Sequence, residues 1–338
     1  PLFAQELSLS NLIEEALKNN PEILSARKTW EASQARIPQA KSLDNPTVGI
    51  SFEKIPKGTL KLNKTMPEDR MLSISQAIPF FGKLSTKGKI ALIESQMMAS
   101  EYKAKELEII NEVKKSYNEL FMHHKIVELN EESLNLLRGI SKVAEARYAV
   151  GEIEQEEVLK IHLEIAKLTN EIENHKREIS AQEAKLNSIL NRDIKGLLGE
   201  PAIKEDISFN KDIDSLYKLT LENQPELAIF NYAIERNKYS KKLAELEFLP
   251  DFMPQLTLRN IFSGGFGLWD FMLALSVPFW FWTKQRYGLK EAINNLESAQ
   301  AAYQAMKNKM LFETKDLFTK LEIAKNRIRL YRENLLPL

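Results

Sequence analysis

The two halves of the chain carry the same sequence landmarks in the same order. Asn19–Ile23 (NNPEI) returns as Asn223–Leu227 (NQPEL), and Ser75–Phe80 (SQAIPF) is echoed by Leu275–Phe279 (LSVPF). A spacing of about 200 residues is far longer than a solenoid repeat of roughly 20–50 residues, so it indicates two related half-structures in one assembly. We therefore expect a first repeat at residues 8–200 and a second at residues 201–338.

Composition excludes several classes of protein. Hydrophobic residues make up 43% and charged residues 28% of the 338 residues, which is typical of an ordered chain. Lys and Arg balance Asp and Glu at 47 each, so no bulk charge attracts nucleic acid. The chain contains no cysteine, which removes disulfides, thiol nucleophiles and a lipid anchor on a cysteine within it.

Helical patterns open each repeat. Apolar residues recur at helical spacing from Leu9 to about Lys41, and again from Leu216 to Leu246. Pro21 and Pro225 stand where a second helix would begin, with Asn20 as the cap of the first of these.

A longer stretch of sequence with a helical pattern follows each expected strand region. From about Ser85 to Tyr148 the sequence predicts one helix of about 95 Å. Gly151 interrupts it, and a second helix from about Glu154 to Leu190 is expected to run back antiparallel, as a coiled-coil-like hairpin with its tip near residues 148–152.

Alternating apolar residues predict strands. Val48, Ile50 and Phe52 share one face of a first strand, and the pattern predicts β-hairpins at about 47–78 and about 253–277, with strands of roughly 9–10 residues. Gly264–Gly265 is expected to lie in the second turn. The longest apolar stretch, Phe271 to Trp282, is shorter than the roughly 18 residues that a membrane-spanning helix needs, which excludes a helical membrane protein.

One apolar and one small, polar face are typical of transmembrane β-barrel strands, although alternation alone favours a soluble β-sandwich. Aromatic residues at the ends of the second strands favour the barrel, because they would form its interfacial girdle. Four strands cannot close a barrel, so several copies would have to combine. The predicted lipid-facing residues are Val48, Ile50, Phe52, Leu273 and Leu275, and the predicted interfacial ones are Phe80, Phe81, Phe279, Trp280, Phe281 and Trp282.

Several short segments lie in a specific order and spacing along nearly all of the chain. They are the repeated Asn-x-Pro-Glu, Asn45-Pro46, Ser75-Gln76 with Ile78–Lys83, Pro278 with its aromatics and Lys284, and Ala146-Arg147-Tyr148 with Gly151. In the order, spacing and duplication of these segments, the sequence resembles the outer-membrane efflux protein family, whose best-known member is TolC.

The resemblance implies a homotrimer in the bacterial outer membrane, in which twelve strands close one β-barrel and the helices form an α-barrel across the periplasm. It implies a passive exit duct that receives solutes from an inner-membrane pump through a periplasmic adaptor, and it places Arg147, Tyr148 and Gly151 at the tip that meets this adaptor. Gly151 could equally do no more than end a helix. The segment Ile78–Lys83 most resembles the branch serving metal-cation or small-molecule pumps of the resistance-nodulation-division type, while type I protein secretion stays open.

The ends of the sequence carry two expectations. Pro1–Gln5 is compatible with the tail of a signal peptide, as Ala4 is small. The second repeat stops before its own tip and return helix, so we expect either a fragment or a naturally truncated protein. For this reason no gating residue is transferred from the family.

Catalysis is not expected. Gly82 to Lys89 has the wrong spacing for a phosphate loop, and no nucleophile with a base is discernible. His123 and His124 point about 100° apart on a helix, and Glu119 with His123 more simply forms a solvated pair, so we expect neither a metal site nor a cofactor. The alternative from another class is a soluble coiled-coil scaffold or adaptor, which explains the helices but not the duplicated strands.

Overall fold

A computed structural model describes residues 7–55, 57–58, 62, 65–66, 69–202, 209–260 and 267–335 of the chain. The chain divides into two compact units: unit 1 comprises Pro1–Arg27 and Tyr102–Asn210, and unit 2 comprises Lys28–Glu101 and Lys211–Leu338. The residues expected to belong to a signal peptide, Pro1–Gln5, and the expected Gly264–Gly265 turn lie outside the described residues. The division into repeats at residues 8–200 and 201–338 stays a prediction.

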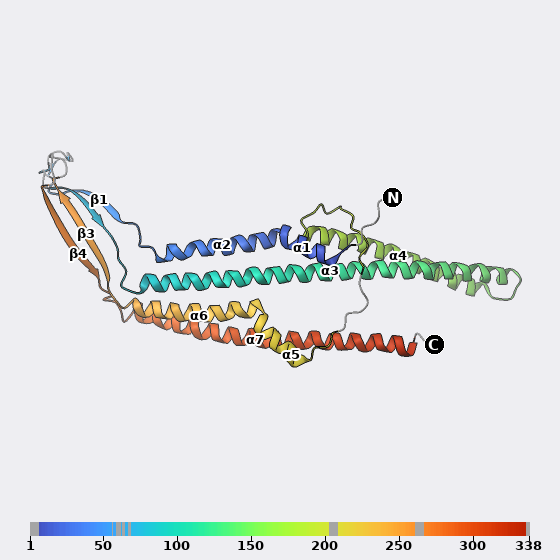
Figure 1. The fold of residues 1–338 in the computed structure, drawn as a ribbon. Helices are drawn as coiled ribbons and strands as arrows, with labels where there is room; N and C mark the ends of the chain where they lie inside the picture. Colours follow the sequence, from blue (N-terminus) through green and yellow to red (C-terminus); the bar gives the residue numbers. More distant parts are fainter. Residues whose placement is uncertain are drawn as a thin grey trace. The chain divides into compact units, whose positions relative to one another are not determined.

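The fold is mainly helical with one four-stranded sheet, as the sequence predicts (Figure 1). The helices are α1 Leu9–Asn19, α2 Pro21–Lys41, α3 Lys83–Ala149, α4 Gln155–Ile189, α5 Ile213–Asn223, α6 Pro225–Leu246 and α7 Lys284–Leu330, with a π-helical turn at Tyr331–Leu335. The strands are β1 Thr47–Phe52, β2 Arg70–Ser75, β3 Asp251–Arg259 and β4 Leu268–Ser276.

Unit 1 is built around an apolar core between α1, α4 and the middle of α3. Val113, Leu120, Leu186 and Leu190 are fully buried in it. The Tyr117 hydroxyl in the same core donates to the carbonyl oxygen of Leu7 (2.7 Å) and accepts from the N–H of Ala202 (3.0 Å). The long helix and its return helix are therefore joined at the end that is distant from the hairpin tip.

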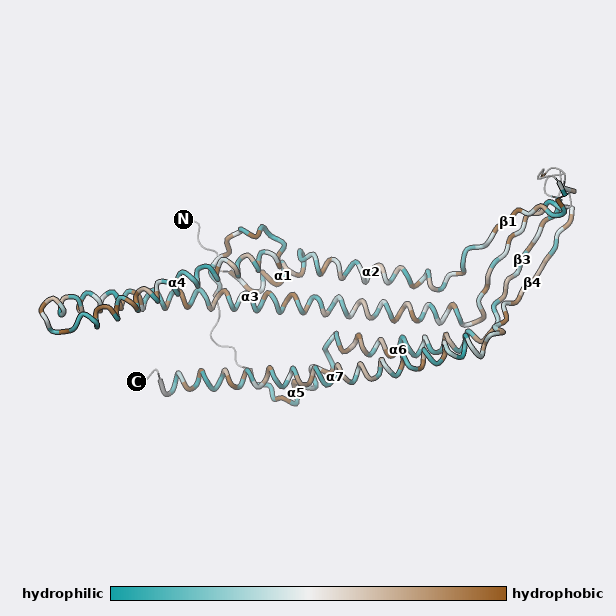
Figure 2. The backbone as a smooth tube through the Cα atoms, turned by 180° about the vertical axis from the view of Figure 1, so that it is seen from behind, coloured by the Kyte–Doolittle hydropathy of each residue, from teal (hydrophilic) through white to brown (hydrophobic). Residues whose placement is uncertain are grey.

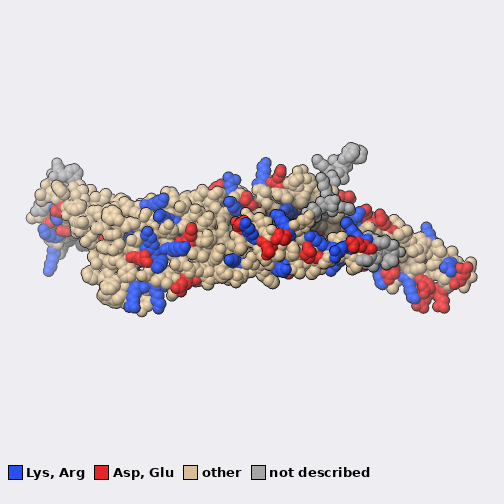
Figure 3. All heavy atoms as spheres, turned by 60° about the horizontal axis from the view of Figure 1, so that its bottom comes forward, with Lys and Arg blue, Asp and Glu red and all other residues tan. Residues whose placement is uncertain are grey.

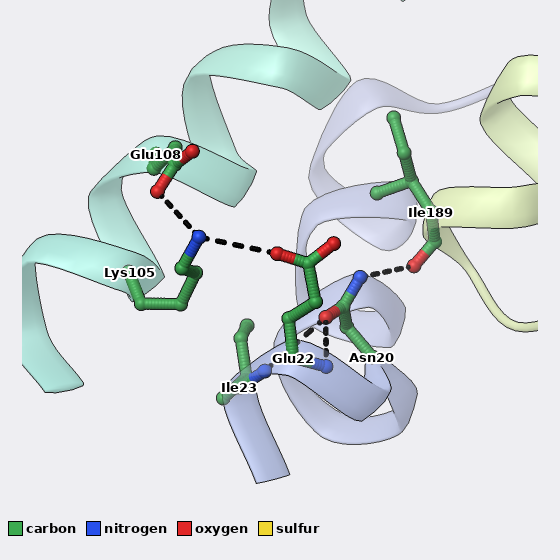
Figure 4. A network of polar contacts seen from close by, with 6 residues as sticks. All are labelled: Asn20, Glu22, Ile23, Lys105, Glu108 and Ile189. Carbon is green, nitrogen blue, oxygen red and sulfur yellow. Dashed lines mark hydrogen bonds and ion pairs between the residues drawn. The ribbon is translucent and has the colours of Figure 1, made fainter. Parts of the chain in front are cut away.

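The repeated Asn-x-Pro-Glu motif has a structural role in the first repeat (Figure 4). The Asn20 side-chain oxygen accepts from the N–H groups of Glu22 (2.9 Å) and Ile23 (3.2 Å), so Asn20 caps α2 as predicted. Its amide donates to the carbonyl oxygen of Ile189 at 2.8 Å. Lys105 bridges Glu22 (3.1 Å) and Glu108 (2.7 Å), and its hydrogen bond to Glu108, followed by that to Glu22, raises the pKa of its ammonium.

Unit 2 places α6 against α7 and α2 against the N-terminal part of α3. Ser33 on α2 donates to Ser95 on α3 at 3.1 Å, and the Lys89 ammonium of α3 lies 5.3 Å from the centre of the Tyr239 ring on α6. Both small hydroxyls are buried, which allows the two helix backbones to approach closely. Along the tube in Figure 2, apolar and polar residues intermingle on these helices, as expected of helices with one packed and one exposed face.

The sheet of unit 2 has the order β1-β2-β3-β4, and every neighbouring pair is antiparallel. Both predicted hairpins are present, but the expected strand length is wrong for the first, since β1 and β2 have only 6 residues each. The register explains the difference. It would place Gln76 between Pro46 and Pro254, and neither proline has an N–H to donate to the ladder. Ile78 then pairs with Phe252 only as an isolated bridge.

Candidate functional site

The strand register brings most of the branched and aromatic apolar residues of the four strands to one face of the sheet. Val48 lies opposite Ile74, Ile74 opposite Leu256, and Leu256 opposite Phe271, which forms one continuous row. Neighbouring rows on this face join Ile50 with Leu72, Leu258 and Trp269, and Pro254 with Leu273. The predicted residues Val48, Ile50, Phe52, Leu273 and Leu275 therefore share this face, which we call the apolar sheet face.

The opposite sheet face carries small and polar residues together with four larger apolar ones, Met71, Met253, Leu268 and Met272. Its four strands contribute Gly49, Ser73, Thr257 and Asp270, which follow one another in register. Figure 3 shows charged side chains of both signs interspersed along the helices but sparse over the sheet. The sheet is therefore two-sided.

The apolar sheet face is open to its surroundings in the single chain. Val48 and Ile50 are each 62% exposed, and Phe271 is 63% exposed. Soluble proteins rarely leave a contiguous apolar patch of this kind uncovered, so the face is suited to contact with lipid or with a partner.

Aromatic residues gather where β2 and β4 end. Phe80 stacks on Phe252 with ring centres 6.1 Å apart, and Phe81 lies 5.9 Å from Phe80. After β4, the Trp282 ring lies 5.7 Å from Trp280 and 5.1 Å from Phe281. Most of these side chains project outward, with Phe81 80% and Phe279 72% exposed. The structure thus places the predicted interfacial aromatics in two clusters that follow the strands, while their contact with a membrane interface stays a prediction.

A buried lysine joins the sheet to the helices of unit 2. The Lys83 side chain is 3% exposed; its ammonium lies 2.8 Å from the Asp251 carboxylate and 3.6 Å from that of Glu247. It also donates to the carbonyl oxygen of Leu249 (3.2 Å), while the Phe80 N–H donates to Asp251 (2.7 Å). These bonds fix the start of α3 against the start of β3.

Sequence reasoning quoted Lys83 within a motif but gave it no role of its own. A usable signal was present, because a cation in the first turn of a helix is unfavourable to the helix dipole unless a carboxylate compensates it. Lys83 is the first residue of α3, and Asp251 and Glu247 supply that compensation.

The helical hairpin ends in a well-defined turn that contains all three predicted tip residues. The N–H of Gly151 donates to the carbonyl oxygen of Tyr148 at 2.9 Å. The N–H of Glu152 donates to the carbonyl oxygen of Arg147, also at 2.9 Å. This is a Schellman motif, in which the residue after the helix must adopt a left-handed conformation, and Gly151 does so with φ of +79°. Arg147 pairs with Glu152 at 3.0 Å, and Tyr148 and Val150 are exposed. Gly151 therefore ends the helix, and contact with an adaptor stays a prediction.

No helix within the described ranges combines the length and the apolar character required to cross a membrane.

Comparisons with known proteins agree with this architecture. The outer membrane protein VceC from Vibrio cholerae superposes with a TM-score of 0.80 at 19% identity, covering 96% of this chain and 81% of VceC. The CmeC outer membrane channel of Campylobacter jejuni gives a TM-score of 0.72 at 15% identity, covering 97% of this chain and 78% of CmeC. The MtrE outer membrane channel of Neisseria gonorrhoeae gives a TM-score of 0.74 at 16% identity, covering 96% of this chain and 76% of MtrE. At these identities the likeness establishes the fold.

A search of curated protein sequences gives no significant match. The sequence model of the family described as "Outer membrane efflux protein" matches residues 12–192. That match spans α1 to α4 with the first hairpin and the tip, which is more than half of the chain. The chain therefore belongs to the outer membrane efflux protein family.

Proposed function

We propose that the chain is one subunit of a trimeric exit duct, which passes solutes from an inner-membrane pump and a periplasmic adaptor across the periplasm and the outer membrane. Membership of the family supports the efflux-channel role and the outer-membrane location. The trimer, the adaptor and the pump are the parts that we add.

The observation that carries the proposal is the apolar sheet face together with the two free edges of the sheet. β1 and β4 are the outer strands of the described sheet, so each has one side without a strand partner. In lipid an unpaired backbone N–H or C=O costs several kcal/mol, so an open edge must be closed by another strand.

Closure by further copies fits the strand directions. Since the order is β1-β2-β3-β4 and all pairs are antiparallel, β4 of one copy runs antiparallel to β1 of the next. An even number of antiparallel strands, about 8 or more, is what outer-membrane barrels use. Three copies supply twelve strands, the number that the family resemblance implies.

The two sheet faces would then have different environments. The apolar sheet face would contact lipid through Val48, Ile50, Phe52, Leu273 and Leu275. The opposite face, with Gly49, Ser73, Thr257 and Asp270, would line a water-filled lumen. The aromatic clusters at Phe80–Phe81 and Phe279–Trp282 would lie at one membrane interface, where amphipathic rings are enriched.

The helical hairpin tip is the proposed adaptor contact. The Schellman turn holds Tyr148 and Val150 outward on a rigid end, and Arg147 and Glu152 offer charges beside them. A small apolar patch with a charged rim is the composition expected of a protein-binding surface. The duct itself would catalyse no reaction.

Disulfide trapping tests the proposed closure. The chain has no cysteine, so introduced pairs are the only thiols present. We would place one cysteine on β1 (Thr47→Cys or Ser51→Cys) and one on β4 (Met272→Cys or Ala274→Cys), all facing the proposed lumen. A disulfide needs Cα atoms about 4.4–6.8 Å apart, so only pairs that are adjacent across the closing edge can form it.

The expected result is a ladder of one, two and three chains after oxidation of at least one pair, with no species above three. Each single-cysteine variant serves as the matched control and should give no species larger than two chains. The mass of the detergent-extracted particle is measured in parallel. A monomeric particle with no cross-link in any of the four pairs contradicts the trimeric duct.

A further inference from the structure

All four histidines of the chain lie on the helical hairpin, at positions 123, 124, 162 and 175. His123 on α3 and His175 on α4 face one another, with their Nδ1 atoms 2.9 Å apart. Their ring centres are 5.1 Å apart and the rings are tilted by 42°. Both side chains are half-buried, so the pair sits between the helices but remains reachable from water.

This contact is a hydrogen bond, in which one hydrogen lies between the two Nδ1 atoms. In neutral imidazoles one Nδ1 carries the hydrogen and the other presents a lone pair, so one ring donates and the other accepts. If the donor shifts its hydrogen to Nε2, both Nδ1 lone pairs become available, with no net loss of a proton. Two converging imidazole lone pairs are then the preferred ligands of a borderline divalent cation.

The observed separation suits such a cation. Metal–imidazole bonds of about 2.0–2.1 Å place two neighbouring ligand nitrogens about 2.9 Å apart at a right angle, and about 3.4 Å apart at the tetrahedral angle. The distance of 2.9 Å matches the first geometry, and a rotation of the two rings would turn both lone pairs from the hydrogen-bond line toward a shared ion. We propose that His123 and His175 form a binding site for a divalent transition-metal ion between α3 and α4.

The surroundings leave the two imidazoles available. Two nearby glutamates of α3 form ion pairs with lysines of α4: Glu119 with Lys185 at 3.9 Å and Glu131 with Lys176 at 2.9 Å. Within the described part of the chain, no cluster of three or more His, Cys, Asp or Glu side chains is placed to hold a metal ion. Water would therefore complete the coordination, and the ion would exchange readily.

The donor set selects the kind of ion. Nitrogen ligands favour Cu²⁺, Ni²⁺ and Zn²⁺ over Mg²⁺ and Ca²⁺, which prefer oxygen, and Cu²⁺ is bound most tightly of the divalent first-row series. A bound ion would link α3 to α4 between the buried core near Leu120 and the hairpin tip. It would thus stiffen the free part of the hairpin. This inference does not depend on the trimer or on the adaptor.

Copper titration of the detergent-extracted full chain, purified without a polyhistidine tag, tests the site. Electron paramagnetic resonance should show one Cu²⁺ per chain with coupling to two imidazole nitrogens. His123→Gln or His175→Gln should remove that signal and weaken binding by about tenfold or more, because each loses a metal–nitrogen bond. His162→Gln on the same hairpin is the matched control and should retain it. Zn²⁺ should raise the thermal midpoint of the parent and leave that of the two variants unchanged.

Either of two results overturns the proposal: no copper signal from two nitrogens in the parent up to about 1 mM Cu²⁺, or the same signal in the parent and in both variants. Circular dichroism confirms that each variant is folded. If a glutamine variant fails to fold, the asparagine variant of the same histidine replaces it and is expected to lose the signal in the same way.

Discussion

The two-sided sheet allows one substitution to test its environment. Leu273 lies on the apolar sheet face, opposite Pro254, and is 54% exposed in the single chain. If that face contacts lipid, Leu273→Arg places a guanidinium in hydrocarbon. If it faces water, the same change only removes an exposed leucine and is nearly neutral.

The position of Leu273 along β4 sets the expected magnitude. β4 runs from Leu268 to Ser276, and Leu273 is one residue from its centre. Nine residues at about 3.3 Å each, tilted by about 40°, span about 23 Å of the membrane normal, so Leu273 lies within a few Å of the midplane. Arginine there costs about 2–4 kcal/mol per subunit, a factor of about 30–700 in the folding equilibrium. In a trimer three such penalties combine.

Ala274→Arg is the matched control. Ala274 is the next residue of β4, faces the opposite side of the sheet and pairs with Met253. It receives the same charge and length, so any difference between the variants reports the environment of the face. Both variants are expressed alongside the parent. Two quantities are measured for each protein: the fraction that resists alkaline extraction from outer membranes, and the fraction that migrates as a heat-sensitive oligomer. We expect Leu273→Arg to lose most of both fractions and Ala274→Arg to retain them.

The reasoning is refuted if Leu273→Arg assembles as well as the parent. It is also refuted if both arginine variants fail to the same extent, because a general intolerance of charge in β4 would then explain the loss.

Three further predictions concern the sheet junction and the hairpin. Asp251→Ala removes the closest carboxylate from the buried Lys83 ammonium and should lower the free energy of unfolding by about 1–3 kcal/mol, measured by urea titration; an unchanged midpoint would exclude a stabilising role. Gly151→Ala has space for its methyl group but must adopt the left-handed conformation, so it should cost about 1 kcal/mol and speed hydrogen exchange at the tip; unchanged exchange would argue against strain. The hydrogen bond from His162, followed by that from Ser141, lowers the pKa of the Glu145 carboxyl. The stabilisation of the hairpin by this contact is therefore fully present above the ordinary pKa of glutamate and is lost as the pH falls through the lowered value. His162→Ala should return the Glu145 pKa, measured by NMR, toward its ordinary value.

Local chemistry explains which elements could be predicted from the sequence. The start of α2 at Pro21 and that of α6 at Pro225 follow from the fixed φ of proline in the first helical turn, and the Asn20 cap from its side-chain oxygen. The turn at Gly151 follows from its conformational freedom. These features involve residues within one turn of each other, so no knowledge of the tertiary structure is needed.

Cross-chain contacts explain what could not be predicted. Whether β2 continues past Ser75 depends on Pro254, which stands opposite Gln76 about 180 residues away. His123 has no local signal for its partner, because His175 faces it only through the crossing register of α3 and α4. Adjacent histidines on one helix point apart, which is why the sequence alone predicts no metal site there.

The sheet joins two hairpins, each formed by strands close in the sequence, but the two hairpins themselves are far apart in the sequence. β1 with β2 and β3 with β4 are sequence neighbours, whereas β2 and β3 pair through residues such as Ser75 and Gln255. Closing so long a loop is costly unless intervening helices have already brought its ends together. We therefore expect the helices to form without the sheet, and the sheet to form only on them.

Ile74→Pro separates these two steps. The substitution removes a backbone N–H from β2, which is an inner strand with a partner on each side. Far-UV circular dichroism should then keep nearly the helical signal of the parent, because Ile74 lies outside every helix, while the heat-sensitive oligomer is lost. A variant that still assembles would show that the β2 ladder is not required. A variant that loses its helices as well would show that the sheet stabilises them, since helices that form first would persist without it.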